Sequence, residues 1–139
     1  MLSFPLAKAA RVLAAVQLTL TAALSHAAGP LPCQGRQTGP GTAQLSCAVD
    51  APAANAPLRF SARFGGVHDD SSASVEASVD GVALPCDAGS VPRFAGEDSG
   101  ETLVCRMSIA VPPGGAARQL LLRVNWHHAA PATAEVTAQ

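Results

Sequence analysis

The sequence predicts an all-β protein, a small antiparallel two-sheet β-sandwich of immunoglobulin-like type with about six or seven strands. Three observations predict it. Apolar and polar residues alternate with period two in several short segments, as in strands that have one buried and one solvated face. Turns rich in Gly and Pro separate these segments. No segment after residue 28 has a sustained 3.6-residue apolar period, so no helix is expected there.

The first 27 residues have the pattern of a secretory signal peptide. One Lys and one Arg are the only charged residues there, and an apolar run follows them at 12–24. Ser25 and Ala27 supply small residues at the −3 and −1 positions before a cut. The run is too short to cross a bilayer, which takes about 20 apolar residues. We therefore expect cleavage after Ala27, a single mature domain at 28–139 and no transmembrane anchor.

The charge of the mature chain excludes one class of partner. Residues 28–139 contain seven Arg and ten acidic residues, which gives a formal charge of −3. Binding of nucleic acid needs a basic stripe, so we expect no nucleic-acid partner. Disorder is not expected either, because disordered chains combine low hydrophobicity with high net charge.

Four cysteines follow the signal segment, at positions 33, 47, 86 and 105. An even number of cysteines in an exported chain predicts disulfides. The sequence has no C-x-x-C motif, so a zinc site is not expected. Three connectivities are possible. Cys86 and Cys105 share the phase of the apolar residues around them, which favours the pairs Cys86–Cys105 and Cys33–Cys47. Each bridge would contribute on the order of 3 kcal/mol, and both indicate a periplasmic or secreted protein.

The predicted strands follow one another with clear turns between them. Asp80-Gly81 lies between two alternating segments and is typical of a type I′ hairpin. Two Pro-rich segments, 52–57 and 112–115, separate longer strands. Alternation predicts strands, in chain order, at 45–49, 58–64, 75–79, 82–84, 103–111, 120–126 and 133–137.

The main candidate for partner binding is the segment 87–101. We expect it to be a long polar hairpin loop without sheet pairing, closed at its base by the second disulfide. Arg93 and Phe94 are of the types that anchor interfaces, and Glu97 and Asp98 add charge beside them. These four residues are the predicted contacts. The alternative is a simple connector in which Phe94 folds back onto the sandwich.

A metal site is the alternative candidate. His68, Asp69 and Asp70 share one polar loop, and His127 and His128 end a predicted strand. Imidazole and carboxylate groups can bind a divalent ion. Neighbours on a strand point to opposite faces, so one histidine of the pair could join the loop residues. The ordinary interpretation is a self-capping turn and two exposed histidines.

A set of arginines occupies the polar phase of the strands. On a single sheet they could form an anion-binding face. Otherwise they belong to a solvated surface and pair with acids such as Glu76 and Asp80. The set comprises Arg59, Arg63, Arg106 and Arg123.

Motifs for nucleophilic or zinc-dependent catalysis, such as G-x-S-x-G and H-E-x-x-H, are absent from the sequence. We therefore expect a binding protein rather than an enzyme, with no cofactor. Its partner would be a protein or another macromolecule of the cell envelope, recognised through end loops. The alternative function is periplasmic binding or delivery of a metal through the histidine and aspartate residues.

Overall fold

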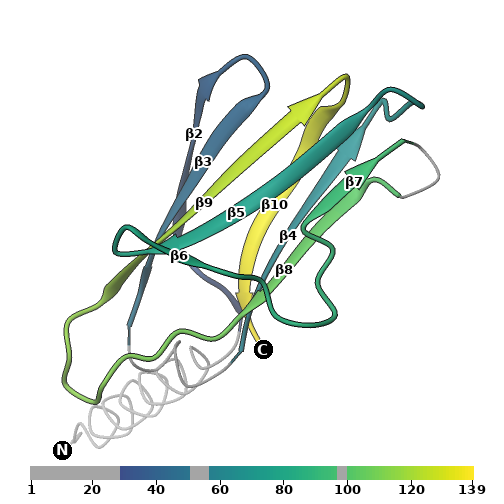
Figure 1. Cartoon of the computed structure of the whole chain (residues 1–139). Coiled ribbons are helices and arrows are strands. Elements are labelled where there is room, and N and C mark those ends of the chain that lie inside the picture. The colour runs from purple at the N-terminus through teal and green to yellow at the C-terminus, as the bar shows by residue number, and fades with distance from the viewer. Residues whose placement is uncertain (1–28, 51–56, 97–99) are drawn as a thin grey trace, which may run out of the picture.

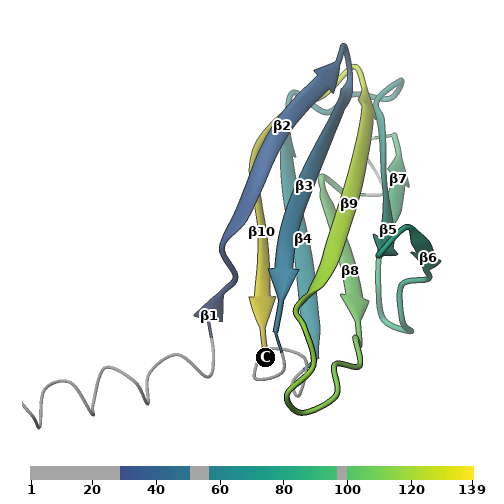
Figure 2. The same ribbon diagram turned by 90° about the vertical axis from the view of Figure 1, so that its left-hand side faces the viewer.

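The computed structural model describes residues 29–50, 57–96 and 100–139 (Figure 1). The regular structure of these ranges is all β-strand, in two antiparallel sheets that form separate layers (Figure 2). The predicted all-β sandwich is therefore confirmed. The expected signal peptide, 1–27, lies outside the described residues. None of the ranges contains a helix long and apolar enough to cross a bilayer.

Ten strands of the described residues make up the two sheets. The four-stranded sheet has the edge-to-edge order β1 (Gly29–Pro30), β10 (Ala130–Ala138), β4 (Leu58–Gly65) and β8 (Thr102–Met107). In the six-stranded sheet the order is β2 (Cys33–Gly39), β3 (Thr42–Val49), β9 (Arg118–His127) and β5 (Ser72–Val79). The remaining edge of β5 pairs with two short strands, β6 (Val82–Leu84) and β7 (Arg93–Ala95).

Seven strands of the described residues contain six residues or more, in agreement with the six or seven expected. Counted along the chain among these seven long strands, β3 is the second, β5 the fourth and β9 the sixth. In the six-stranded sheet β9 lies between β3 and β5. Immunoglobulin domains place their fifth strand there. The architecture is thus an immunoglobulin-like sandwich with a strand connectivity of its own.

Alternation along each long strand directs one set of side chains between the sheets. In β4, for example, Phe60 and Phe64 are fully buried, whereas Arg59 and Arg63 lie in the outward phase. Burial of an aromatic or aliphatic side chain contributes about 1.5–3 kcal/mol. The largest fully buried side chains come from both sheets and are Phe60, Phe64, Leu58, Leu103, Met107, Leu120 and Leu122.

Two predicted strands differ from the observed ones. The segment at 103–111 forms ladder pairs only as far as Met107, although Ile109 and Val111 continue its inward phase and are buried. The strand β2 was not expected, because its sequence CQGRQTG has no apolar alternation and most of its residues are exposed. Backbone pairing with β3 is what makes β2 a strand.

Two tight turns connect neighbouring strands. Asp80 and Gly81 have φ values of 49° and 82°, as a type I′ turn requires, so the predicted β5–β6 hairpin is confirmed. The β2–β3 turn contains Gly41, whose φ is +70°. A Cβ atom at Gly41 would lie 2.5 Å from the backbone oxygen of Trp126. Glycine therefore lets this turn pack directly against the end of β9.

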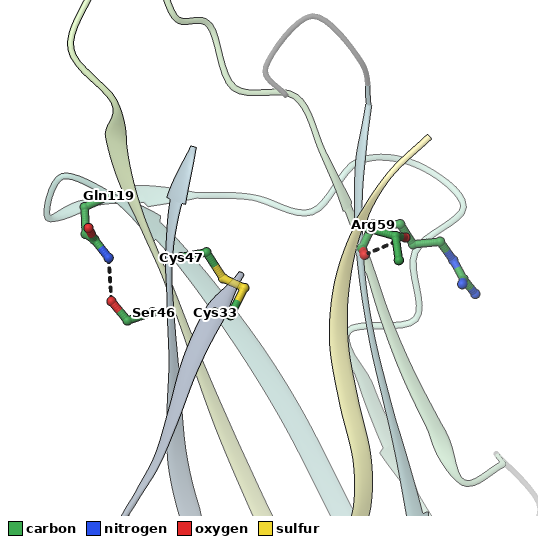
Figure 3. Close-up of a disulfide and its surroundings, with 6 residues drawn as sticks. Cys33, Ser46, Cys47, Arg59 and Gln119 are labelled. Atoms are coloured by element: carbon green, nitrogen blue, oxygen red, sulfur yellow. Dashed lines mark hydrogen bonds between the residues drawn. A yellow bond between two sulfur atoms is a disulfide. The ribbon is translucent and has the colours of Figure 1, made fainter. Parts of the chain in front are cut away.

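Both predicted disulfides are present. Cys33 and Cys47 face each other on β2 and β3 with their Cα atoms 4.4 Å apart (Figure 3). Cys86 follows β6 and binds Cys105 of β8, with the Cα atoms 5.1 Å apart. Because β6 and β8 belong to different sheets, the second disulfide joins the two layers. Such bridges fit an oxidising compartment.

Candidate functional site

Three turns meet at one end of the sandwich, at the top of Figures 1 and 2. They connect β2 to β3 at 40–41, β4 to β5 at 66–71, and β9 to β10 at 128–129. We call this region the loop end. Four of the five residues of the predicted metal site lie in these turns, namely His68, Asp69, Asp70 and His128. The fifth, His127, is the last residue of β9 and precedes the β9–β10 turn.

A buried serine joins two of these turns. Ser71 is 1% exposed, and its hydroxyl accepts a hydrogen bond from the backbone N–H of His68 at 2.8 Å. The same hydroxyl donates to the backbone oxygen of His128. The N–H of Ser71 donates to the backbone oxygen of His68 at 3.0 Å. The β4–β5 turn is therefore closed on itself and fixed to the β9–β10 turn.

An acid–histidine contact reinforces this connection at the surface. The carboxylate of Asp70 contacts Nδ1 of His128, and this hydrogen bond lowers the pKa of Asp70. The ring of His128 stacks on that of His127, with the ring centroids 3.8 Å apart. Both histidines and Asp70 are exposed.

The predicted metal site is only partly assembled. Of its five residues, Asp70 and His128 form a direct contact between a loop acid and a strand-end histidine. In the part of the chain that the structure describes, however, no three His, Cys, Asp or Glu side chains are grouped closely enough to hold a metal ion. The geometry at Asp70 and His128 is that of a hydrogen-bonded pair.

A hollow of about 430 Å³, lined by both polar and apolar residues, lies beside the loop end on the outer face of the six-stranded sheet. Arg93 of β7, Ser74 of β5 and Asn125 of β9 stand opposite one another in one row across the three strands. His127 stands opposite Ser72 in the next row. The serines are short, so the longer side chains beside them form the walls of the hollow and the serines form its floor.

The segment 87–101 differs from the prediction. We expected a loop without sheet pairing, but β7 pairs with β5 and Val91 forms an isolated bridge with Val104. Phe94 is 3% exposed and packs edge-to-face on Phe64, with the ring centroids 5.5 Å apart. Phe94 is thus a core residue, and a partner could not reach it on the folded surface.

Of the other predicted contacts in this segment, Arg93 is exposed and lines the hollow. Glu97 and Asp98 lie outside the described residues. The hollow also contains Ser72, Ser74 and Asn125, which were not among the contacts predicted from the sequence. The alternation of polar and apolar residues indicates that these side chains face outward. Their proximity to Arg93, however, depends on strand order and register.

The four arginines do not share one face. Arg59 and Arg63 of β4 and Arg106 of β8 lie on the four-stranded sheet, whereas Arg123 lies on the six-stranded sheet opposite Glu76. Arg63 forms an ion pair with Glu101 at 3.0 Å. The four-arginine face that the sequence suggested is therefore not formed, and only Arg59, Arg63 and Arg106 share a sheet.

Comparisons with protein-family models, with curated proteins and with solved structures find no match for this chain.

Proposed function

We propose that the protein is exported and binds a macromolecular partner, a protein or another envelope component, at the hollow beside the loop end. The observation that carries the proposal is the row Arg93–Ser74–Asn125, next to His127. It offers a guanidinium from β7 and an amide and an imidazole from β9, on either side of the small hydroxyl side chains of β5. Arginine is among the residues most enriched at the energetic centres of interfaces.

The rigidity of the surroundings supports binding at this place. Arg93 and Asn125 are held in register by β5, and the nearby turns are fixed by Ser71 and the Asp70–His128 contact. Groups that are already ordered lose little conformational entropy when a partner binds.

Export is part of the proposal. The features of residues 1–27 and the two disulfides both support it, and the destination is the periplasm or the exterior. N-terminal sequencing of the protein from the producing cell is expected to begin at Ala28 or within two residues of it. Retention of Met1 on a soluble cytoplasmic protein would contradict export.

The binding proposal is tested with the double variant Arg93→Ala/His127→Ala. Immobilised wild-type protein is incubated with an envelope extract, and the captured molecule is identified. Its affinity is then measured for the wild type, for the double variant and for Arg36→Ala. The control removes an exposed arginine of β2 that does not line the hollow.

The double variant is expected to weaken binding by at least about 30-fold, which corresponds to about 2 kcal/mol, the scale of an interface hot spot. Arg36→Ala is expected to bind as the wild type does. A captured molecule that binds all three proteins equally would place the interface elsewhere and contradict the proposal.

A metal-binding function is the second candidate, and the contact between Asp70 and His128 is the observation that favours it. Metal binding requires deprotonated imidazole. If it occurs, His68→Ala and acidification below a pH of about 6.5 would each abolish it. Calorimetry with copper, zinc and nickel tests it directly, and absence of heat with all three ions would exclude it.

A further inference from the structure

Two arginines stand directly opposite each other on the outer face of the four-stranded sheet. Arg59 of β4 pairs in register with Arg106 of β8. Their chain neighbours are buried, so alternation directs both arginine side chains away from the core. Residues directly opposite on an antiparallel pair have their Cβ atoms about 4.5–5.5 Å apart. Two cationic side chains therefore start from the same small area of the surface.

Neither of these arginines forms an ion pair within the described residues. Among the ion pairs of the described residues, Arg63 binds Glu101 and Arg118 binds Asp80, but neither Arg59 nor Arg106 takes part in one. Glu135 is on the same face but stands opposite Ser61, one row further along. Like charges directly opposite each other destabilise a sheet, so the free protein carries a local repulsion that an anion would remove.

The two side chains are placed so that an anion can reach them. Arg59 is half-buried, and its side chain points away from the sandwich (Figure 3). Arg106 is exposed, and its Nη1 atom lies beside Gly89, where an added Cβ would come within 3.4 Å of it. The segment that contains Gly89 is fixed to β8, because the Arg106 N–H donates to Ser90 Oγ at 2.8 Å and the Asp87 N–H donates to the Arg106 oxygen at 2.7 Å.

We propose that Arg59 and Arg106 form a binding site for a phosphate or sulfate dianion. The planar guanidinium group binds the oxygens of such anions in a bidentate manner. Together the two guanidinium groups carry two positive charges, which match a dianion better than the single charge of a carboxylate. A phosphate monoester is close to dianionic above a pH of about 6.

This site is independent of the proposed partner-binding hollow. The hollow lies on the outer face of the six-stranded sheet, whereas Arg59 and Arg106 belong to the other sheet. Failure of one proposal therefore leaves the other unaffected, and variants at the two sites can be tested separately.

Thermal unfolding with inorganic phosphate tests the site. The protein is unfolded in a zwitterionic buffer of low ionic strength near pH 7.5, with phosphate or with sodium chloride of equal ionic strength. Phosphate at ten times its dissociation constant is expected to raise the Tm of the wild type by about 5 °C relative to chloride. Sulfate is expected to act similarly and acetate much less.

The variants Arg59→Gln and Arg106→Gln are expected to lose most of this rise. Without phosphate, each is expected to unfold at the wild-type Tm or above it, because the repulsion is gone. Arg106→Lys keeps the charge but not the planar fork, and is expected to keep only part of the rise. The matched control is Arg36→Gln, which removes an exposed arginine of the other sheet and is expected to behave as the wild type.

If phosphate raises the Tm of Arg106→Gln as much as that of the wild type, the proposal is overturned. Phosphate also stabilises proteins without binding, because it is excluded from their surface, and that effect does not depend on Arg106. Co-sedimentation with vesicles of phosphatidic acid shows whether the bound phosphate group belongs to a lipid headgroup or to a soluble molecule. Co-sedimentation that Arg59→Gln abolishes assigns the site to a lipid headgroup. A phosphate-dependent thermal shift without co-sedimentation assigns it to a soluble phosphate.

Discussion

The buried hydroxyl of Ser71 donates a hydrogen bond to the backbone oxygen of His128, 57 residues further along the chain. The two residues belong to turns that connect different pairs of strands, β4 to β5 and β9 to β10. Both turns cross from one sheet to the other. One small side chain thus couples two crossovers at the end of the sandwich where the candidate site lies.

Replacement of Ser71 with Ala is expected to destabilise the protein by about 1–3 kcal/mol. The change removes the partner of the His68 N–H and of the His128 oxygen, and leaving buried polar groups unpaired has a cost of that size. Urea unfolding measures it. Ser78→Ala, on the outer face of β5, is the control and is expected to change stability by less than about 0.5 kcal/mol. Equal effects of the two substitutions would show that the hydrogen bonds of Ser71 contribute nothing.

Asp80 is expected to make stability depend on pH in the acid range. A hydrogen bond from the Gln119 N–H, at 2.9 Å, and the Arg118 guanidinium, at 3.0 Å, lower the pKa of Asp80. The ionised carboxylate is thus favoured in the folded state. Its contribution is fully present above the unfolded pKa of about 3.9 and is lost as the pH falls towards the lower folded pKa.

Asp80→Asn tests this dependence, and Asn can adopt the positive φ of the turn. Urea unfolding between about pH 5 and pH 2 is expected to show a smaller loss of stability on acidification for the variant than for the wild type. Asp87→Asn removes a different exposed carboxylate and serves as the control. If Asp80→Asn loses as much stability on acidification as the wild type, the interactions of Asp80 do not favour its ionised form.

The two disulfides are expected to contribute unequally. Cys33–Cys47 connects strands that are already paired by a backbone ladder, whereas Cys86–Cys105 joins the two sheets and anchors the segment that leads to β7. Removal of a native disulfide from a small exported domain costs about 2–5 kcal/mol. We expect Cys86→Ala/Cys105→Ala at the upper end of this range and Cys33→Ala/Cys47→Ala at the lower end. Calorimetric unfolding of both variants decides between this order and its reverse.

Much of the fold is predictable because it depends on local side-chain phase. Alternation identifies the core positions of β4, β5, β8 and β9, and it places Cys105 correctly in the core. The same argument for Cys86 leads to the correct disulfide pairing, although Val82, which shares its phase, is 69% exposed. Asp80-Gly81 identifies the hairpin because few dipeptides accept two positive φ values. The strand β2 carries no such signal, since an exposed edge strand buries few side chains.

The candidate sites depend on information that local phase does not contain. Arg93, Ser74 and Asn125 form one row only because β7, β5 and β9 are neighbours in a particular register. The same is true of Arg59 and Arg106, whose opposition follows from the β4–β8 ladder. Strand order is set by the packing of the whole chain, so the sequence pattern could identify these residues as outward-facing but could not place them together.

Phe94 and Arg93 are adjacent in the chain but are expected to have separable roles. Phe94 lies in the core against Phe64, so Phe94→Ala is expected to destabilise the protein by about 3–5 kcal/mol through lost burial and a residual cavity. Arg93 is exposed on β7, so Arg93→Ala is expected to change stability by no more than about 0.5 kcal/mol and to weaken partner binding instead.

Urea unfolding of the two single variants separates these roles. A partner-binding assay of Phe94→Ala, under conditions where it remains folded, completes the comparison. We expect it to bind with nearly the affinity of the wild type, because its side chain does not reach the surface. If Phe94→Ala instead keeps the wild-type stability and loses binding, then Phe94 leaves the core in solution. The segment 87–101 would in that case act as the binding loop that its sequence predicts.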